Sequence, residues 1–280
     1  MIIGAHLSIA KGMPAAIEQA QSIAANAFQF FTRNPRGGRA RTIPMEEIEV
    51  FMGQRQEQSI EYVLGHMPYT INLATNRPDI HEFGKRTLLD DLQRFDAAGV
   101  EHLVMHPGSH LGDGIEVGVN RIAEALTYVF EHYQGKTRLL LETMAGHGTE
   151  IGSNLDEMEM IFSALGWPEQ LGIGLDSCHL FAAGYDVTTN QGLDELAAEI
   201  DRKIGWRRVG MMHLNDSKKG LGSGIDRHEK IGQGMIGLDG IAKIINHGAY
   251  KDMPFVLETP VADYLEYGEE IRLVRQLRRE

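Results

Sequence analysis

Eight short apolar runs recur along the chain, and each ends at or beside a residue that can bind a metal or contact a ligand. With these last residues included, the runs span 2–6, 27–33, 62–66, 103–106, 139–142, 171–176, 209–213 and 255–258. Apolar runs of this length are typical of buried strands. Charge without a partner is costly at the end of a buried strand, so its repetition indicates that these positions serve chemistry.

Helical segments separate the runs, because apolar residues recur there at three- to four-residue spacing, for example around Ala16, Leu88, Ile122 and Met158. Alternation of strands and helices predicts parallel strands with helical crossovers. Eight such units in 280 residues, with no Pro- or Ser-rich linker, predict an α/β fold: a single (β/α)8 TIM barrel over residues 1–280. In such a barrel the carboxyl ends of all strands meet at one face, which would gather the run ends into a ring.

Composition narrows the class of protein. With 42% hydrophobic and 24% charged residues, the chain is typical of soluble globular proteins. No apolar stretch approaches the ~20 residues that span a bilayer, and no signal-peptide pattern opens the sequence. Cys178 is the only cysteine, which excludes an intrachain disulfide and favours a reducing compartment. We therefore expect a cytoplasmic protein without membrane segments, and a monomer because no oligomerisation element stands out.

The net charge of −12 argues at first against a nucleic-acid partner, since phosphates favour basic surfaces. Two features weaken this objection. Arg33 ends the second run and Arg36, Arg39 and Arg41 follow it closely, and metal ions bound among converging carboxylates would reverse the local field. The arginine run is consistent with a solvated loop or with a nucleic-acid contact, and Tyr69, after the third run, with packing or with base stacking.

Residues that can ligate metals concentrate at the run ends and in two later loops, and histidine with carboxylate suits zinc and similar ions. The candidates are His66, His106, Glu142, Asp176, His213 and Glu258 at run ends, and His179, Asp226 and His228 in loops. Four ligands normally satisfy one zinc ion, so this set indicates two or three ions with a bridging carboxylate. Three divalent ions would outweigh the four carboxylates and form a receptor for a phosphodiester. Glu142, Asp176 and Glu258 are the catalytic candidates.

Three further residues near the same face are not expected to bind the ions directly. We expect His6 and His110 to hydrogen-bond the metal ligands without contacting the ions themselves. Cys178 lies between two candidate ligands in the sequence, and we interpret it as a small buried residue rather than a thiolate ligand.

Five longer segments closely resemble the endonuclease IV family, in matching order along nearly the whole chain. They are 4–8 (Gly-Ala-His-Leu-Ser), 106–110 (His-Pro-Gly-Ser-His), 176–186 (beginning Asp-Ser-Cys-His), 212–218 (beginning Met-His-Leu-Asn-Asp) and 222–234 (containing Asp-Arg-His). The Asp-Ser-Cys-His and Asp-Arg-His segments are the most specific of the five.

The resemblance implies a zinc-dependent DNA repair endonuclease on a TIM barrel, acting at apurinic or apyrimidinic sites in double-stranded DNA. Such an enzyme hydrolyses the phosphodiester 5′ to the lesion and leaves a 3′-hydroxyl and a 5′-deoxyribose phosphate. Three zinc ions are implied, with manganese as a substitute. The first would be held by His66, His106 and Glu142, the second by Glu142, Asp176, His213 and Glu258, and the third by His179, Asp226 and His228.

The resemblance also implies that two loop residues contact DNA. The family inserts side chains into the lesion from positions that Arg36 and Tyr69 occupy here. Flipping a nucleotide out of the stack costs on the order of a few kcal/mol, and least where a base is already missing. This chain departs from the family beside both residues, where Gly37-Gly38 and Thr70 stand in place of larger side chains.

Two other functions compete with this interpretation. A sugar isomerase or epimerase on a related barrel also uses Glu, Asp and His at strand ends, and a fold alone does not assign function. Such enzymes need one or two metals and have no counterpart to His179 with Asp226 and His228. A non-catalytic metal store is disfavoured, because the ligands come from many segments around one cleft.

Overall fold

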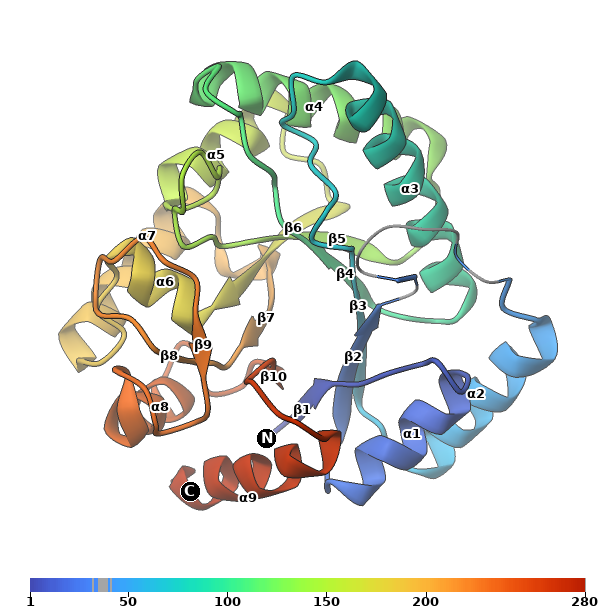
Figure 1. Cartoon of the computed structure of the whole chain (residues 1–280), viewed down its shortest axis with the longest axis vertical. Coiled ribbons are helices and arrows are strands. Elements are labelled where there is room, and N and C mark those ends of the chain that lie inside the picture. The colour runs from blue at the N-terminus through green and yellow to red at the C-terminus, as the bar shows by residue number, and fades with distance from the viewer. Residues whose placement is uncertain (32, 35–39, 41, 280) are drawn as a thin grey trace.

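Eight parallel strands close into a barrel in the computed structural model, which describes residues 1–31, 33–34, 40 and 42–279 (Figure 1). The barrel strands are β1 (Ile3–His6), β2 (Ala27–Phe31), β3 (Tyr62–His66), β4 (His102–Met105), β5 (Arg138–Glu142), β6 (Leu171–Asp176), β7 (Val209–His213) and β10 (Phe255–Leu257). Each pairs with its neighbour in sequence, and β10 pairs with β1 to close the ring. The predicted (β/α)8 barrel is therefore confirmed.

Helices surround the barrel on all sides (Figure 1). They are α1 (Met13–Ser22), α2 (Met45–Glu57), α3 (Pro78–Ala97), α4 (Ile115–His132), α5 (Leu155–Ala164), α6 (Ser177–Ala183), α7 (Asn190–Lys203), α8 (Gly237–Asn246) and α9 (Tyr267–Leu277), with short 3₁₀ turns at Trp206–Arg208 and Tyr264–Glu266. Two helices, α6 and α7, fill the connection between β6 and β7. Within the described residues, no helix is both long enough and apolar enough to span a membrane.

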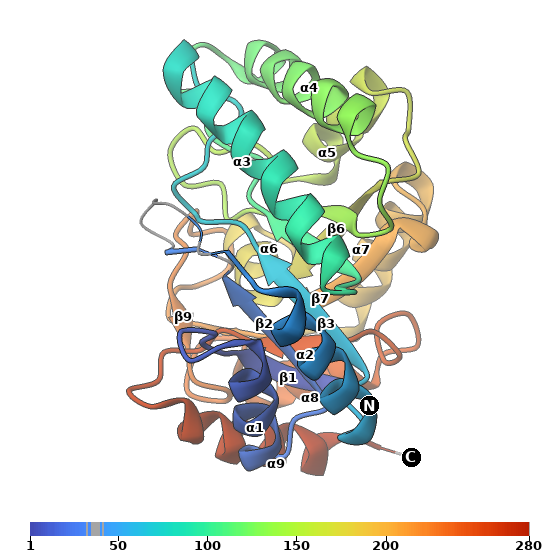
Figure 2. The ribbon, with the colours of Figure 1, turned by 90° about the vertical axis from the view of Figure 1, so that its right-hand side faces the viewer.

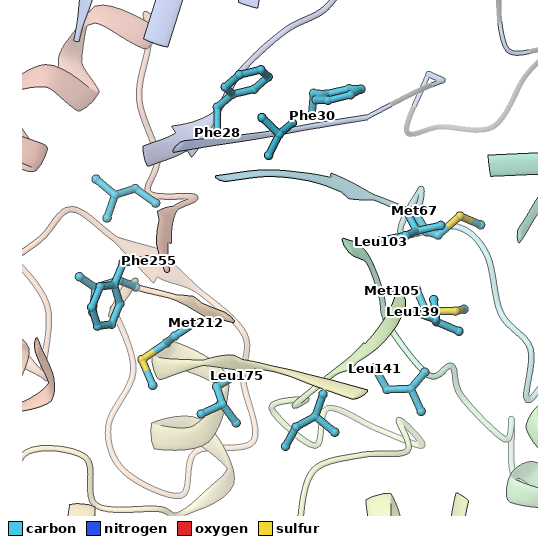
Figure 3. Packing of buried hydrophobic residues seen from close by; sticks show 14 of the residues in the cluster. Phe28, Phe30, Met67, Leu103, Met105, Leu139, Leu141, Leu175, Met212 and Phe255 are labelled. Atoms are coloured by element: carbon cyan, nitrogen blue, oxygen red, sulfur yellow. The ribbon is translucent and has the colours of Figure 1, made fainter. Parts of the chain in front are cut away.

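Side chains alternate between two apolar layers along every strand, because successive residues of a strand point to opposite faces. One set points outward and packs against the helices, as Phe28, Leu139, Leu141 and Phe255 do in Figure 3. The other set fills the barrel interior and consists of Ala27, Tyr62, Leu64, Val104, Leu140, Met211 and Val256. The next inward position along each strand lies at the carboxyl end, directly above this interior layer.

The carboxyl ends of the strands lie at the end of the barrel away from both chain termini (Figure 2). A small antiparallel ribbon of β8 (Asp216–Ser217) and β9 (His228–Glu229) stands at this end. The two chain termini lie close together at the opposite end (Figure 2).

A polar pair, buried at Tyr62 and half-buried at His102, occupies the amino-terminal end of the barrel. The hydroxyl of Tyr62 lies 2.8 Å from His102 Nδ1, and burial, with nearby Arg138 as the second cause, lowers the pKa of His102 to about 4. An unfolded histidine keeps a pKa of about 6.5. Between these two pKa values His102 is protonated in the unfolded chain but neutral in the folded chain. Folding stability therefore falls as pH falls from about 6.5 to about 4.

We expect His102→Gln to reduce this acid sensitivity. Between pH 7.5 and pH 4.5, the wild-type chain should lose about 1–3 kcal/mol more of its unfolding free energy than the variant does, because the variant has no proton to take up at this position. Urea unfolding at the two pH values measures the difference. His132→Gln, at an exposed position in α4, is the matched control and should follow the wild type. Equal losses in His102→Gln and wild type would contradict the prediction.

Candidate metal centre

The alternation of the strands accounts for the position of most candidate ligands. Each lies two residues beyond an inward position of its strand, as His66 follows Leu64 and Glu142 follows Leu140. The same step places His106, Asp176, His213 and Glu258 above the interior layer. Glu142, Asp176 and His213 have no exposed surface at all. The barrel therefore presents these side chains inward at one level, beneath the loops of the carboxyl-terminal face.

Glu142 lies at the centre of the cluster. Its Oε2 is 3.1 Å from His66 Nε2 and 3.3 Å from His106 Nε2, while its Oε1 is 2.8 Å from His213 Nδ1. His66, Glu142 and His213 each offer one ligand atom, and these atoms lie within 4.8 Å of one another. His106 contacts the group from the rim, with 24% of its side chain exposed. Glu142 therefore has one oxygen toward His66 and His106 and the other toward His213.

A second group contains three of the four carboxylates of the centre. Ligand atoms of Glu142, Asp176, His213 and Glu258 lie within 4.8 Å of one another. His213 Nδ1 is 3.9 Å from Asp176 Oδ2 and 3.7 Å from Glu258 Oε2. These are the four residues that the family resemblance implies for a second ion, and the structure brings them together.

The third group joins a helix residue to a loop. His179, in the first turn of α6, has Nε2 3.3 Å from Asp226 Oδ2, and His228 has Nε2 3.3 Å from Asp226 Oδ1. Both Nε2 atoms are buried and make no hydrogen bond within the described residues. Buried polar atoms without a partner are rare in folded proteins and call for a bound group that satisfies them.

Asp216 fixes the loop that carries Asp226 and His228. Its buried carboxylate accepts hydrogen bonds from the backbone N–H groups of Ser217, Gly232, Gly234, Ile236 and Gly237. A Cβ on Gly234 would lie 2.4 Å from Asp216 Oδ1, so only glycine allows this approach. The loop from β7 to α8 is thereby held over the strand ends.

Backbone carbonyls determine which ring nitrogen of three histidines carries a proton. Nδ1 of His66 is 2.6 Å from the carbonyl of Met67, and Nδ1 of His179 is 2.8 Å from that of Thr143. Nδ1 of His228 likewise lies 3.2 Å from the carbonyl of Glu258. A carbonyl only accepts, so each Nδ1 donates. In the neutral ring the Nε2 lone pair then faces a carboxylate, an arrangement that requires a proton or a metal ion between them.

The ionisation of the carboxylates suits a cation site. Burial would raise the pKa of Glu142, yet His213 and His106 hold it well below its usual value. The pKa of Glu258 is likewise lowered against burial, with His213 as the main cause. In return, Glu258 and Glu142 raise the pKa of His213 to about 9 against the effect of its burial. In the described structure every ion pair of the four carboxylates is with a histidine, so a metal that replaces the histidine protons fits this donor set.

The second strand contributes a residue that the sequence analysis missed. The second run ends at Arg33, which contributes no ligand and pairs with Asp91 and Asp90 at 2.6 Å each. The inward polar residue of β2 is Gln29, which is completely buried and lies 2.7 Å from His213. The signal was a single amide inside the run Ala27–Phe31, at the inward position two residues after Ala27.

The two histidines with predicted supporting roles differ in position. His6 Nδ1 lies 2.8 Å from Gln29 and 3.5 Å from Glu258, so it contacts the cluster. His110 Nδ1 accepts hydrogen bonds from the N–H groups of Gly112 and Gly114 in its own loop, and no contact between His110 and a candidate ligand is found among the described residues.

The remaining candidates lie at the edge of the centre or outside the described residues. Cys178 is buried beside Asp176 and His228 and within reach of the same space, and burial raises the pKa of its thiol to about 12, so the thiol keeps its proton. Tyr69 is 54% exposed on the loop after β3. Arg36 lies outside the residues that the structure describes.

Comparisons with known proteins agree with this geometry. A family model described as a xylose isomerase-like TIM barrel matches residues 17–277. A protein of Moorella thermoacetica named probable endonuclease 4 is 47% identical, with 99% of each chain covered. The crystal structure of endonuclease IV from Thermus thermophilus has a TM-score of 0.86 and 34% identity, over 99% of this chain and 98% of that one.

A D-tagatose 3-epimerase-like protein, at 17% identity and a TM-score of 0.74, covers 99% of this chain and 98% of its own, and shows a shared fold alone. The resemblance expected from the sequence is confirmed by the relatives of higher identity. This chain belongs to the endonuclease 4 family.

Proposed function

We propose that this protein is a DNA repair endonuclease that hydrolyses the phosphodiester 5′ to abasic sites in duplex DNA, with zinc ions as cofactors. Membership of the endonuclease 4 family makes the chain a DNA-cleaving hydrolase. The observation that carries the finer proposal is the pair of buried Nε2 atoms of His179 and His228, which lack hydrogen-bond partners and face Asp226. This third group goes beyond the strand-end ligands on which a one- or two-metal isomerase depends.

Three ions would occupy the three groups. His66, His106 and Glu142 would hold the first, Glu142, Asp176, His213 and Glu258 the second, and His179, Asp226 and His228 the third. Glu142 would bridge the first two, because its Oε2 faces His66 while its Oε1 faces His213. Zinc suits this mixture of imidazole and carboxylate, and manganese could substitute.

Divalent ions held here would supply a nucleophilic water at neutral pH and stabilise negative charge on the leaving 3′ oxygen. The residues of the chain prepare the site for that chemistry. Neighbouring histidines lower the pKa of Glu142 and of Glu258, which favours their ionised forms, and the ring nitrogens of His66, His179 and His228 are fixed by backbone carbonyls. The ligands thus keep their orientation without reorganising during the reaction.

Selection of the lesion would depend on loops around the centre. Tyr69 is exposed on the loop that follows His66, where its ring could stack in the gap left by a missing base. Arg36 is the proposed second contact. A monomeric state and a cytoplasmic location stay predictions from the sequence.

The first test is incision of a duplex with one abasic site by the purified chain. We expect a single cut 5′ to the site, about three zinc ions per chain by elemental analysis, and loss of cutting after treatment with a chelator, since the metals supply the nucleophile. The undamaged duplex of the same sequence is the control. One ion per chain without incision would exclude the proposal.

The second test removes the third group with Asp226→Ala combined with His228→Ala. We expect the variant to lose one ion and at least ~10²-fold in incision rate, since a ligand group is deleted whole. Asp194→Ala with His247→Ala is the matched control, because it removes a His–Asp pair at 3.0 Å on α7 and after α8. The control should keep its metals and its rate. An unchanged incision rate in the first double variant would show that incision does not need the third group, and would contradict the three-ion proposal.

The third test concerns Tyr69. Tyr69→Ala should raise the KM for abasic duplex, with a loss of about 1–3 kcal/mol of binding as expected for one stacked base, and should leave the metal content unchanged. Tyr69→Phe keeps the ring and should retain most of the activity, while Phe83→Ala, at a site 50% exposed on α3, controls for loss of a surface ring. Equal kinetics in Tyr69→Ala and Phe83→Ala would remove Tyr69 from the DNA contact.

A further inference from the structure

Gln29 connects three members of the centre through one carboxamide. Its Oε1 lies 2.7 Å from His213 Nε2, and its Nε2 lies 2.5 Å from Glu258 Oε1 and 2.8 Å from His6 Nδ1. The side chain is completely buried. The ring of Phe31, the next inward residue of β2, lies 4.3 Å from the ring of His6 and 5.5 Å from that of His66. Gln29 is therefore held in a closed space beside the ligands.

Donor and acceptor chemistry leaves a single arrangement for this amide. The nitrogen of Gln29 donates to Glu258 Oε1, and a carboxylate that serves as a metal ligand can only accept, so the nitrogen must face it. The amide oxygen then faces His213, and because an amide oxygen only accepts, His213 Nε2 must carry a proton. The other ring nitrogen, Nδ1, is left facing Glu142 Oε1 at 2.8 Å.

We propose that Gln29 is a positioning residue that selects the ring nitrogen with which His213 binds metal and holds Glu258 against the same ion. The proposal rests on the proposed metal centre. A histidine ligand normally donates its second ring N–H to an acceptor that fixes its orientation, and for His66, His179 and His228 this acceptor is a backbone carbonyl. His213 has the side chain of Gln29 in that role.

This positioning role needs both an acceptor for His213 and a donor for Glu258, and an amide side chain provides both. A carboxylate at this position would accept from His213 but would repel Glu258, which lies 2.5 Å from the amide nitrogen. An apolar side chain would leave His213 Nε2 and Glu258 Oε1 without these bonds, and the ring of His213 could then turn either nitrogen toward the ion. Loss of such a partner typically costs about 10–100-fold in metal affinity.

The closing experiment compares Gln29→Met, which keeps the volume and removes the amide, with wild type loaded with zinc alone. Nitrogen-15 spectra of the histidine rings should show a slowly exchanging Nε2–H for His213 in wild type. In Gln29→Met this signal should disappear. Zinc should also pass from the variant to a chromogenic chelator about 10–100-fold faster than from wild type, or at a correspondingly lower chelator concentration.

Three further variants separate positioning from packing. Gln29→Ala removes the same amide without placing a methionine in its space, and should give the same loss of the His213 signal. Gln29→Glu restores an acceptor and should restore the His213 Nε2–H. Gln19→Met removes an amide that donates to the carbonyls of Ser8 and Ala15, away from the ligands, and should behave as wild type in both measurements.

A wild-type His213 signal in Gln29→Met or Gln29→Ala, with zinc transfer within twofold of wild type, would overturn the proposal. Neither measurement uses DNA. A wild-type chain that holds zinc but leaves an abasic duplex intact would therefore overturn the proposed function while the assignment of Gln29 stands.

Discussion

Mutual repulsion among buried carboxylates is the constraint on which the rest of the structure depends. Glu142 and Asp176 are buried, and ligand atoms of Glu258 lie within 4.8 Å of theirs. Asp226 is more exposed and joins them through His179 and His228. An unneutralised cluster of this kind would be very costly to fold. In the described residues only histidines form ion pairs with these four acids, so either protonated rings or metal ions among them would neutralise the cluster. Charge that the chain itself does not fully neutralise is what makes the centre a receptor for cations.

Most of this arrangement could be predicted because it follows from strand geometry. A period of two along parallel strands places every second residue inward, so an acid or histidine at the end of an apolar run must join one ring. Leu140 and Glu142 illustrate the rule, since the first fills the interior and the second begins the centre. The Asp226–His228 spacing also predicted two ligands on one loop, and His179 meets them from the first turn of α6.

What the sequence did not reveal depends on contacts between distant segments. Gln29 is separated from His213 and Glu258 by most of the chain, and an uncharged amide in an apolar run resembles an ordinary strand residue. Arg33 appeared to be part of a basic loop, but two adjacent acids of α3 hold its guanidinium. The hydrogen-bond partners of His110 could not be predicted from the apolar pattern either, because they are the N–H groups of Gly112 and Gly114 in its own loop.

The candidate metal centre has one set of ligands on the barrel strands and another set on a loop. The strand ligands are held by the barrel itself, whereas the loop ligands depend on the course of the loop. Strand residues such as His66, Glu142 and His213 are fixed by the barrel, which is shared with epimerase-like proteins. Asp226 and His228 depend on a long loop whose course is set by the buried carboxylate of Asp216 and its five backbone donors. A change in that loop could add or remove the third group without disturbing the strands. Under the proposed function, the strand ends would account for metal binding in general, and the loop would account for the nuclease activity in particular.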